Sequence, residues 1–370
     1  MRPRPNRLER LPQQYFVELL ARVAAEAAKE GEPLVNFGRG NPEVGPPEHV
    51  IEAAQRAAAD YETHGYPPFR GLPELREAVA QRYSDVYGVD VDAHAEVAVV
   101  PGTKTAIVEL ALVTAERGST IVLPDPGYPD YFSGVALADA RLATVPIDDL
   151  TDAPGDDVAA LYLNFPSNPV ALCAPSGLFD DAIRYARDSG AVIVHDFAYG
   201  DLVFDRRAPE SFLSHDGAKE VGVEMFSMSK SYGMAGWRLG FVVGNAEIVE
   251  RINVLQDHNR AGVFRAVQEA GIAALRGPQE SVEERRRRYE ERRNRVVDVL
   301  PLKAVSEGTF YVWIELPPGL TCARLLIEHR VALAPGEGFG ARGAGFARIS
   351  LAVMDEVFER GLERLLGTLQ

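Results

Sequence analysis

The sequence predicts an α/β protein whose mainly parallel central sheet is covered by helices on both faces and followed by a smaller α+β region. Short apolar stretches alternate with helical patterns along the first two thirds of the chain. These stretches are continuously apolar, which indicates strands buried on both faces. Polar residues repeatedly follow the strand ends, at the edge where open α/β sheets bind ligands.

Composition limits the possible classes of function. A chain of 370 residues is expected to form two domains. The net charge of −15 disfavours nucleic acids and anionic membranes as partners. The two cysteines, Cys173 and Cys322, predict neither a disulfide framework nor a metal site. Because the start lacks the apolar core of a signal peptide and no apolar run is long enough to span a bilayer, we expect a cytoplasmic protein.

Residues 1–35 are expected to form an N-terminal arm that packs on the small domain or on a neighbouring subunit. A Pro- and Arg-rich start precedes a predicted helix over residues 15–29. Residues 34–42 read as a short strand that breaks into a Gly-rich loop. Gly38 and Gly40 in this loop would permit the backbone to approach a ligand closely.

Residues 36–248 are expected to form the large domain. The predicted strands cover residues 97–100, 120–123, 141–145, 158–164, 191–194, 221–226 and 239–243. Helices are predicted over residues 49–60, 74–83 and 178–189, with one more ending at Glu116. The turn at residues 101–106 joins a strand to that helix, and such a turn exposes backbone N–H groups to an anion.

Residues 249–370 are expected to form the small domain. Its predicted helices, the first of which starts just before it, cover residues 246–255, 265–276, 281–300, 320–330 and 356–369, and its strands cover 309–316 and 347–352. The helix over residues 281–300 is rich in arginine. Glu283 and Glu284 precede Arg287 and Arg288 by four positions, so we interpret this helix as solvated and ion-paired rather than as a nucleic-acid site.

Lys230 suggests the chemistry. It follows an apolar strand, and burial of an ammonium group is costly unless the group is paired or neutral. A lysine in this position suits an amine nucleophile that forms a Schiff base with an aldehyde. Asp196 ends the strand before it, where its carboxylate needs a cation such as a pyridinium N–H. Arg238, with hydroxyls and turn N–H groups, suits a phosphate. Together these groups describe a site for pyridoxal 5′-phosphate.

The run Ser-Met-Ser-Lys-Ser-Tyr-Gly-Met-Ala-Gly-Trp-Arg-Leu-Gly at residues 227–240 resembles a specific motif of the fold-type I aminotransferases of class I/II. Residues 124–129 and 336–340 are further matches. The resemblance extends from about residue 33 to the end and is greatest to the LL-diaminopimelate, alanine and aromatic branch. It implies a three-layer fold, pyridoxal 5′-phosphate as cofactor, and amino-group transfer between an α-amino acid and a 2-oxo acid.

The resemblance also implies roles for residues around the cofactor ring. Lys230 resembles the Schiff-base lysine, and Asp196 matches the aspartate that pairs with the pyridine nitrogen. Tyr199 matches the phenol that bonds the ring hydroxyl. Asn168 matches the asparagine that contacts the same oxygen and the substrate carboxylate. Tyr128 matches the aromatic residue that stacks on the ring.

Further matches concern the phosphate and the substrate. The phosphate ligands implied by the resemblance are Gly102, Thr103, Lys104, Ser227 and Arg238. Tyr66 matches a tyrosine that reaches the phosphate from the partner subunit, which implies a homodimer with shared active sites. Arg348 matches the arginine that binds the substrate carboxylate through two parallel hydrogen bonds. Gly40 matches a residue whose backbone contacts the same carboxylate.

Two departures from the family pattern affect the substrate more than the chemistry. The usual Asn-Pro-Thr-Gly loop is Asn-Pro-Val-Ala at residues 168–171, and the usual Gly-Ser-Lys-Glu turn is Gly-Thr-Lys-Thr at residues 102–105. Specialised relatives use the same residues for cyclisation, oxidation or β-elimination, and another reaction of this kind is the alternative function. A regulatory module that has lost activity is disfavoured by the intact set of site residues.

Three positively charged loop residues are candidates for binding a distal carboxylate of the substrate, namely Arg39, Arg70 and Lys104. His195 precedes Asp196 and is open to two interpretations. It is either an indirect partner of that carboxylate or a packed core histidine, and we favour the second.

Overall fold

The computed structural model describes residues 4–150 and 153–369. The beginning of the Pro- and Arg-rich start and the last residue of the expected small domain lie outside the described residues. A seven-stranded sheet with the order β2-β8-β7-β6-β5-β3-β4 dominates the fold. Only β8 runs antiparallel to its neighbours, which confirms the mainly parallel sheet. The strands are β2 (Val97–Val100), β3 (Thr120–Asp125), β4 (Arg141–Pro146), β5 (Val158–Asn164), β6 (Val192–Asp196), β7 (Gly222–Ser227) and β8 (Gly240–Gly244).

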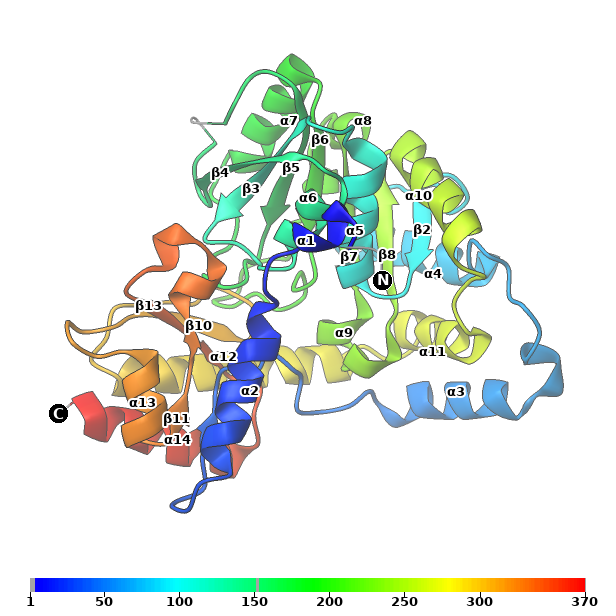
Figure 1. Ribbon diagram of the computed structural model, residues 1–370. Coiled ribbons are helices and arrows are strands. Elements are labelled where there is room, and N and C mark those ends of the chain that lie inside the picture. The colour runs from blue at the N-terminus through cyan, green and yellow to red at the C-terminus, as the bar shows by residue number, and fades with distance from the viewer. Residues whose placement is uncertain (1–3, 151–152, 370) are drawn as a thin grey trace.

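Helices cover both faces of this sheet and give three layers (Figure 1). Alternate strand residues point to opposite faces. Ile193 of β6 therefore packs in one core with residues of α4 (Pro73–Tyr87) and α7 (Leu178–Ser189). Val194 packs in the other core. The helices of that second core are α5 (Thr103–Thr114), α6 (Tyr131–Leu137) and α10 (Ala246–Asn259).

Local chemistry sets several helix ends. Pro73 stands in the first turn of α4, where its missing N–H costs nothing. Gly88 ends the same helix at φ 68°, and Gly190 ends α7 at φ 76°, a conformation that favours glycine. Asn245 caps α10, since its side chain accepts the N–H groups of the first turn.

A smaller antiparallel sheet has the order β12-β13-β10-β9, and a separate parallel pair joins β1 to β11. The strands are β1 (Val35–Asn36), β9 (Ala304–Val305), β10 (Tyr311–Glu315), β11 (Val331–Ala332), β12 (Ala334–Pro335) and β13 (Phe346–Ser350). The helices α12 (Glu280–Val299), α13 (Cys322–Glu328) and α14 (Asp355–Leu369) accompany these strands. Arg287 of α12 lies within 3.7 Å of Glu283, as expected, whereas Arg288 pairs with Glu43 and Asp355 instead of Glu284.

The expected domain boundary at 248/249 falls inside α10. This helix packs on β2, β8 and α5 of the large sheet, and α11 (Arg265–Arg276) packs on α3 (Glu48–Ala59) and α4. We therefore propose that the second region begins between α11 and α12, where the chain turns toward the small sheet (Figure 1).

The N-terminal arm contains α1 (Asn6–Glu9) and α2 (Tyr15–Ala27). The first contacts α6, and the second contacts α13 of the same chain. Leu19 and Val23 form the buried side of α2. The remaining short helices are α8 (Ala218–Val221) and α9 (Met228–Ser231), with 3-10 turns η1 (Tyr61–Thr63), η2 (Phe212–Ser214), η3 (Ala235–Trp237), η4 (Gly336–Phe339) and η5 (Ala341–Gly343). None of the helices in the described part of the chain is long and apolar enough to cross a bilayer.

Gly361 provides a test of the packing of α14 on β1. A Cβ at this position would collide with the ring of buried Phe37. We expect Gly361→Ala to destabilise the protein by about 1–3 kcal/mol because the ring must move. Gly367 lies in the same helix with nothing close to it, so Gly367→Ala should keep or raise stability. Equal apparent melting temperatures for the two variants, followed by circular dichroism, would contradict this packing.

Candidate active site

A cavity of about 390 Å³ lies where the large sheet meets the small one. Asn164, Asp196 and Ser227 line it from the C-terminal ends of β5, β6 and β7, because neighbouring parallel strands end at one edge of the sheet. The predicted site residues that line it are Gly40, Thr103, Lys104, Tyr128, Asn168, Asp196, Tyr199, Ser227, Lys230, Arg238 and Arg348.

Two residues of the predicted cofactor site do not line the cavity. Gly102 lies just behind it, and a Cβ there would collide with the guanidinium of Arg238. Tyr66 lies outside, and its side chain is 87% exposed. The expected reach of Tyr66 into a partner subunit stays a prediction.

Lys230 lies in α9, directly after β7. Its Nζ donates to the carbonyl of Gly40 at 3.3 Å and lies 5.7 Å from the ring centre of Tyr199. Burial lowers the pKa of Lys230 to about 8, and the charges of Arg348 and Arg238 act in the same direction. A substantial share of this amine is therefore neutral near pH 8, as a nucleophile or a base requires.

Asp196 ends β6 as a buried carboxylate. Its Oδ2 accepts a hydrogen bond from the hydroxyl of Tyr131 at 2.8 Å, and its Oδ1 accepts one from the N–H of Ala198 at 3.2 Å. Burial raises the pKa of Asp196, and the two hydrogen bonds oppose this shift. No ion pair within the described residues includes Asp196, so its carboxylate is oriented but has no cation.

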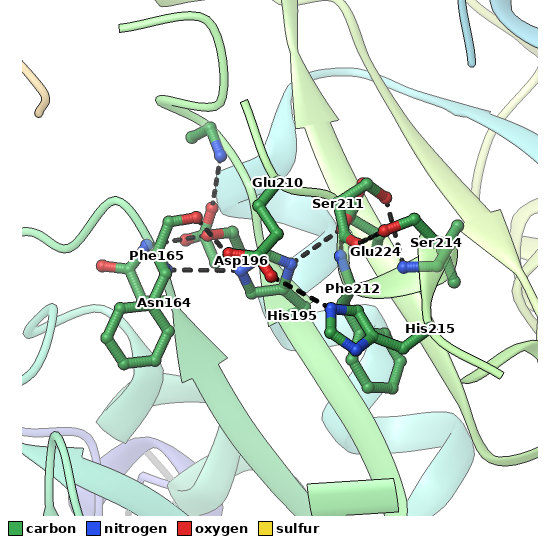
Figure 2. Close-up of polar contacts among 12 residues, drawn as sticks. Asn164, Phe165, His195, Asp196, Glu210, Ser211, Phe212, Ser214, His215 and Glu224 are labelled. Carbon is green, nitrogen blue, oxygen red and sulfur yellow. Dashed lines mark hydrogen bonds and ion pairs between the residues drawn. The ribbon is translucent and has the colours of Figure 1, made fainter. Parts of the chain in front are cut away.

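Asn164 connects Asp196 with the far side of the cavity. Its side-chain NH₂ donates to the backbone carbonyl of Asp196 at 2.8 Å (Figure 2), and its side-chain oxygen accepts the N–H of Asn168 at 2.8 Å. The side-chain oxygen of Asn168 accepts in turn from Arg348 at 2.5 Å. One amide therefore fixes the loop that meets Arg348 relative to the strand that carries Asp196.

Arg348 is a fully buried arginine on β13. It donates to the carbonyl of Gly38 at 3.1 Å, and its guanidinium lies 3.9 Å from the ring centre of Tyr311. Its Nε has no hydrogen-bond partner, and no carboxylate of the described chain pairs with it. A buried guanidinium without a counter-ion is costly, so the position suits an anionic ligand such as a carboxylate.

The opposite edge of the cavity is suited to a second anion. Thr103 begins α5, and a helix N-terminus attracts negative charge through its free N–H groups. Ser227 and Arg238 lie at the same edge, and Arg238 has no acidic partner among the described residues. Lys104 lines the cavity as well, but its Nζ is paired with Asp130 at 2.9 Å.

His195 points to the other face of the sheet, as alternation along β6 requires. Figure 2 shows it between Phe165 and Glu224, with its Nδ1 2.8 Å from a Glu224 oxygen. Glu224 also accepts hydrogen bonds from Tyr83, Ser211 and the N–H of Phe212, each at 2.9 Å. His195 is thus a packed core histidine.

Tyr131, Asn164 and Tyr311 are among the cavity and support residues that the sequence prediction missed. Asn164 ends a predicted strand, and this position alone signals a residue at the binding edge. Tyr131 follows Tyr128 by three positions, but its contact with Asp196 joins segments 65 residues apart. The role of Arg70 as a contact for a distal carboxylate stays a prediction. This arginine lies outside the cavity and pairs with Glu250 at 2.7 Å and Asp257 at 2.9 Å.

Comparison with known proteins agrees with this geometry. Residues 32–365 match the family model of aminotransferase class I and II. The chain is 41% identical to the L-glutamine–4-(methylsulfanyl)-2-oxobutanoate aminotransferase of Bacillus subtilis, over 97% of this chain and 94% of the relative. It is 36% identical to an LL-diaminopimelate aminotransferase of Moorella thermoacetica, over 97% of both chains.

The fold also matches solved structures along its whole length. Substrate-bound BacF of Bacillus subtilis superposes with a TM-score of 0.94 at 34% identity, over 100% of this chain and 98% of BacF. An aminotransferase of Staphylococcus aureus gives a TM-score of 0.91 at 33% identity, over 99% of both chains. The three-layer aminotransferase fold is thereby confirmed. Because the family model and these relatives span nearly the entire sequence, the chain belongs to the aminotransferase class I and II family.

Proposed function

We propose that this aminotransferase uses pyridoxal 5′-phosphate and that the residues of the cavity perform its reaction as follows. Transfer of an amino group between an amino acid and a 2-oxo acid is the activity of the family to which the chain belongs. These roles are assigned from one observation, which is that charged side chains in the cavity lack partners of opposite charge. Lys230, Arg238 and Arg348 have no acidic partner among the described residues, and Asp196 has no cation.

The charges that line the cavity support this cofactor, because cationic groups lie at one edge and a carboxylate without a cation lies on β6. Arg238, Ser227 and the start of α5 would hold its phosphate, and the close approach of Gly102 to Arg238 keeps that edge open. Asp196 would hold the pyridine nitrogen, and Lys230 would bind the aldehyde. When bound, the cofactor supplies an electron sink that makes the Cα–H of an amino acid acidic.

Tyr128, Tyr199 and Asn168 complete the proposed cofactor contacts, Tyr128 on the ring face and the other two at the ring hydroxyl. All three line the cavity. Tyr66, which is exposed, would reach the phosphate in a second copy of the chain. A homodimer with shared active sites is therefore part of the proposal.

The remaining steps belong to the chain itself. Arg348 would bind the α-carboxylate through two parallel N–H donors, with Asn168 and the backbone of Gly40 beside it. This contact would orient the substrate so that its Cα–H faces Lys230. Once the amino group of the substrate has displaced Lys230 from the aldehyde, the freed neutral Nζ would accept the Cα proton as a general base and return it later in the reaction.

The direct test is an amino-donor panel with pyruvate or 2-oxoglutarate as acceptor. We expect amino exchange with at least one donor and complete loss of exchange in Lys230→Ala, because the other lysine that lines the cavity, Lys104, has its Nζ paired with Asp130. Absence of exchange with every donor would contradict the proposed function. Formation of cyclic, oxidised or eliminated products instead would favour the alternative reaction on the same site. Full activity of Lys230→Ala would contradict the role of this lysine.

The lowered pKa of Lys230 predicts a pH dependence. Covalent attachment of the aldehyde to the protein without cofactor requires the neutral amine. Because a lysine is neutral above its pKa, the attachment rate should rise with pH and reach half its maximum near the value of about 8. An unperturbed lysine would give a midpoint near about 10.4. Stopped-flow absorbance between pH 6 and pH 10 measures the midpoint, and a rate that keeps rising steeply to pH 10 would contradict the shift.

Tyr131 is expected to support the affinity for the cofactor. Tyr131→Phe removes the hydroxyl that donates to Asp196, a bond to a charged group that is worth about 1.5–3 kcal/mol. Fluorescence titration should show at least about tenfold weaker cofactor binding. Tyr162→Phe is the matched control, since the Tyr162 hydroxyl donates to the carbonyl of Ile107 instead. Equal affinities in the two variants would contradict the role of Tyr131.

A further inference from the structure

Tyr311 lines the cavity, and the proposed reaction gives it no role. It begins β10, and its side chain is 2% exposed. Its hydroxyl lies 3.1 Å from the hydroxyl of Tyr199, and its ring centre lies 3.9 Å from the guanidinium carbon of Arg348. Because Tyr199 is proposed to bind the cofactor ring and Arg348 the substrate carboxylate, one side chain contacts a binding residue at each end of the site.

The hydrogen bond between the two phenols acquires a direction when a ligand occupies the ring site. A hydroxyl has a single proton to donate. Burial raises the pKa of Tyr199 well above its usual value, and Tyr311 acts in the same direction, so Tyr199 keeps its proton at neutral pH. When Tyr199 donates this proton to the ring oxygen, its own oxygen must accept from Tyr311. The donors then run from Tyr311 through Tyr199 to the ring, and each bond in such a chain strengthens the next.

The backbone holds the two phenols at this separation. The N–H of Tyr311 donates to the hydroxyl of Thr309 at 3.0 Å, and its carbonyl accepts from the hydroxyl of Ser306 at 2.6 Å. Thr309 has φ 67°, a conformation that is rare for a β-branched residue and persists only where the surroundings enforce it. Its N–H donates to the carbonyl of Leu202 at 2.6 Å, and the N–H of Leu202 donates to the carbonyl of Tyr199 at 2.8 Å. The segment that carries Tyr311 is therefore bonded directly to the turn that carries Tyr199.

The ring of Tyr311 supports the guanidinium of Arg348. In the register of β10 and β13, Tyr311 pairs with Ser350 and Trp313 pairs with Arg348, so Tyr311 and Arg348 are diagonal neighbours on one face. The ring of Phe339 also lies near the guanidinium, at 4.9 Å. Contact between an aromatic face and a buried guanidinium is favourable, and it leaves the N–H groups at the edge of the guanidinium for a carboxylate.

We propose that Tyr311 is a positioning residue for both ends of the site. Its hydroxyl strengthens the hydrogen bond that Tyr199 donates to the cofactor, and its ring keeps the guanidinium of Arg348 in the plane that a substrate carboxylate requires. This inference rests on the proposed function. It also separates two effects within one side chain, since loss of the hydroxyl affects the cofactor, whereas loss of the ring affects the carboxylate as well.

Tyr311→Phe tests the hydroxyl. The visible absorbance of the bound cofactor depends on the protonation of the nitrogen that joins it to Lys230. A strong donor at the ring oxygen stabilises the negative charge that remains after this nitrogen loses its proton, and it therefore lowers the pKa of the nitrogen. In Tyr311→Phe the pH midpoint of the absorbance change should rise by about 0.4–1 pH unit, the effect of one neutral hydrogen bond. An unchanged or lowered midpoint would overturn the proposal.

Two further variants show whether the hydroxyl acts through Tyr199. Tyr162→Phe is the matched control, because it removes another buried hydroxyl, one that donates to the carbonyl of Ile107, and its midpoint should equal that of the wild type. In a Tyr199→Phe background, Tyr311→Phe should cause no further rise, since the residue that transmits the effect is absent. An equal rise in Tyr162→Phe, or additive rises in the double variant, would overturn the proposal.

Tyr311→Leu tests the ring, and propanoate is the probe because it has one carboxylate and cannot react. Titration of the holoenzyme, followed by absorbance, gives its dissociation constant without turnover. We expect this constant to rise at least about threefold in Tyr311→Leu, because the guanidinium loses its aromatic support, and by less than about twofold in Tyr311→Phe. Equal constants in Tyr311→Leu and the wild type, or an equal rise in both variants, would overturn the role of the ring.

Failure of this inference differs from failure of the proposed function. If the wild-type protein binds the cofactor and exchanges amino groups, but Tyr311→Phe leaves the midpoint unchanged, only the assignment of Tyr311 is wrong. If the wild-type protein binds no cofactor, or exchanges amino groups with no donor, the proposed function is wrong and the role of Tyr311 falls with it.

Discussion

The site depends on one constraint, which is the burial of Arg348 without a carboxylate partner in the described chain. A lone buried guanidinium would be strongly destabilising unless its N–H groups were satisfied. The side chain of Asn168, the carbonyl of Gly38 and the face of Tyr311 satisfy part of this need. The remainder is left for a ligand. Burial is the main cause of the lowered pKa of Lys230, and the positive charge of Arg348 lowers this pKa further. The buried arginine therefore contributes both to the charge offered to a ligand and to the reactivity of the lysine.

Much of this arrangement was predictable because the chemistry follows strand ends. Asp196 and Lys230 come directly after apolar strands, and parallel strands bring such positions to one edge. Contacts that join distant segments were not predictable. The bond of Tyr131 to Asp196 and the ion pairs of Arg70 depend on how helices pack, which local patterns do not encode. The boundary expected at 248/249 lies inside α10, and the packing of this helix on the large sheet is another contact of this kind.

Side chains on the two faces of β6 contribute to different parts of the structure. Asp196 faces the cavity, whereas His195 and Glu224 close a buried polar cluster on the other side. Glu224 accepts hydrogen bonds from the hydroxyls of Tyr83 and Ser211 and from the N–H of Phe212, and the Nδ1 of His195 lies 2.8 Å from its second oxygen, so the buried carboxyl group is fully partnered. Because the Nε2 of His195 also lies 3.1 Å from the carbonyl of Phe165, the cluster fixes the start of the loop that carries Asn168. The geometry of the cavity is thus supported from the face that no ligand touches.

The cavity collects side chains from Phe16 in α2 to Arg348 in β13, which are separated by nearly the whole sequence. While a ribosome is still synthesising the chain, the large sheet can form before the small sheet has emerged. The pocket at that stage has Asp196 and Lys230 but lacks Arg348 and Tyr311. Contacts of such large sequence separation are slow to form. A complete pocket therefore requires synthesis to have passed Arg348, well after Asp196 and Lys230 have been added to the chain.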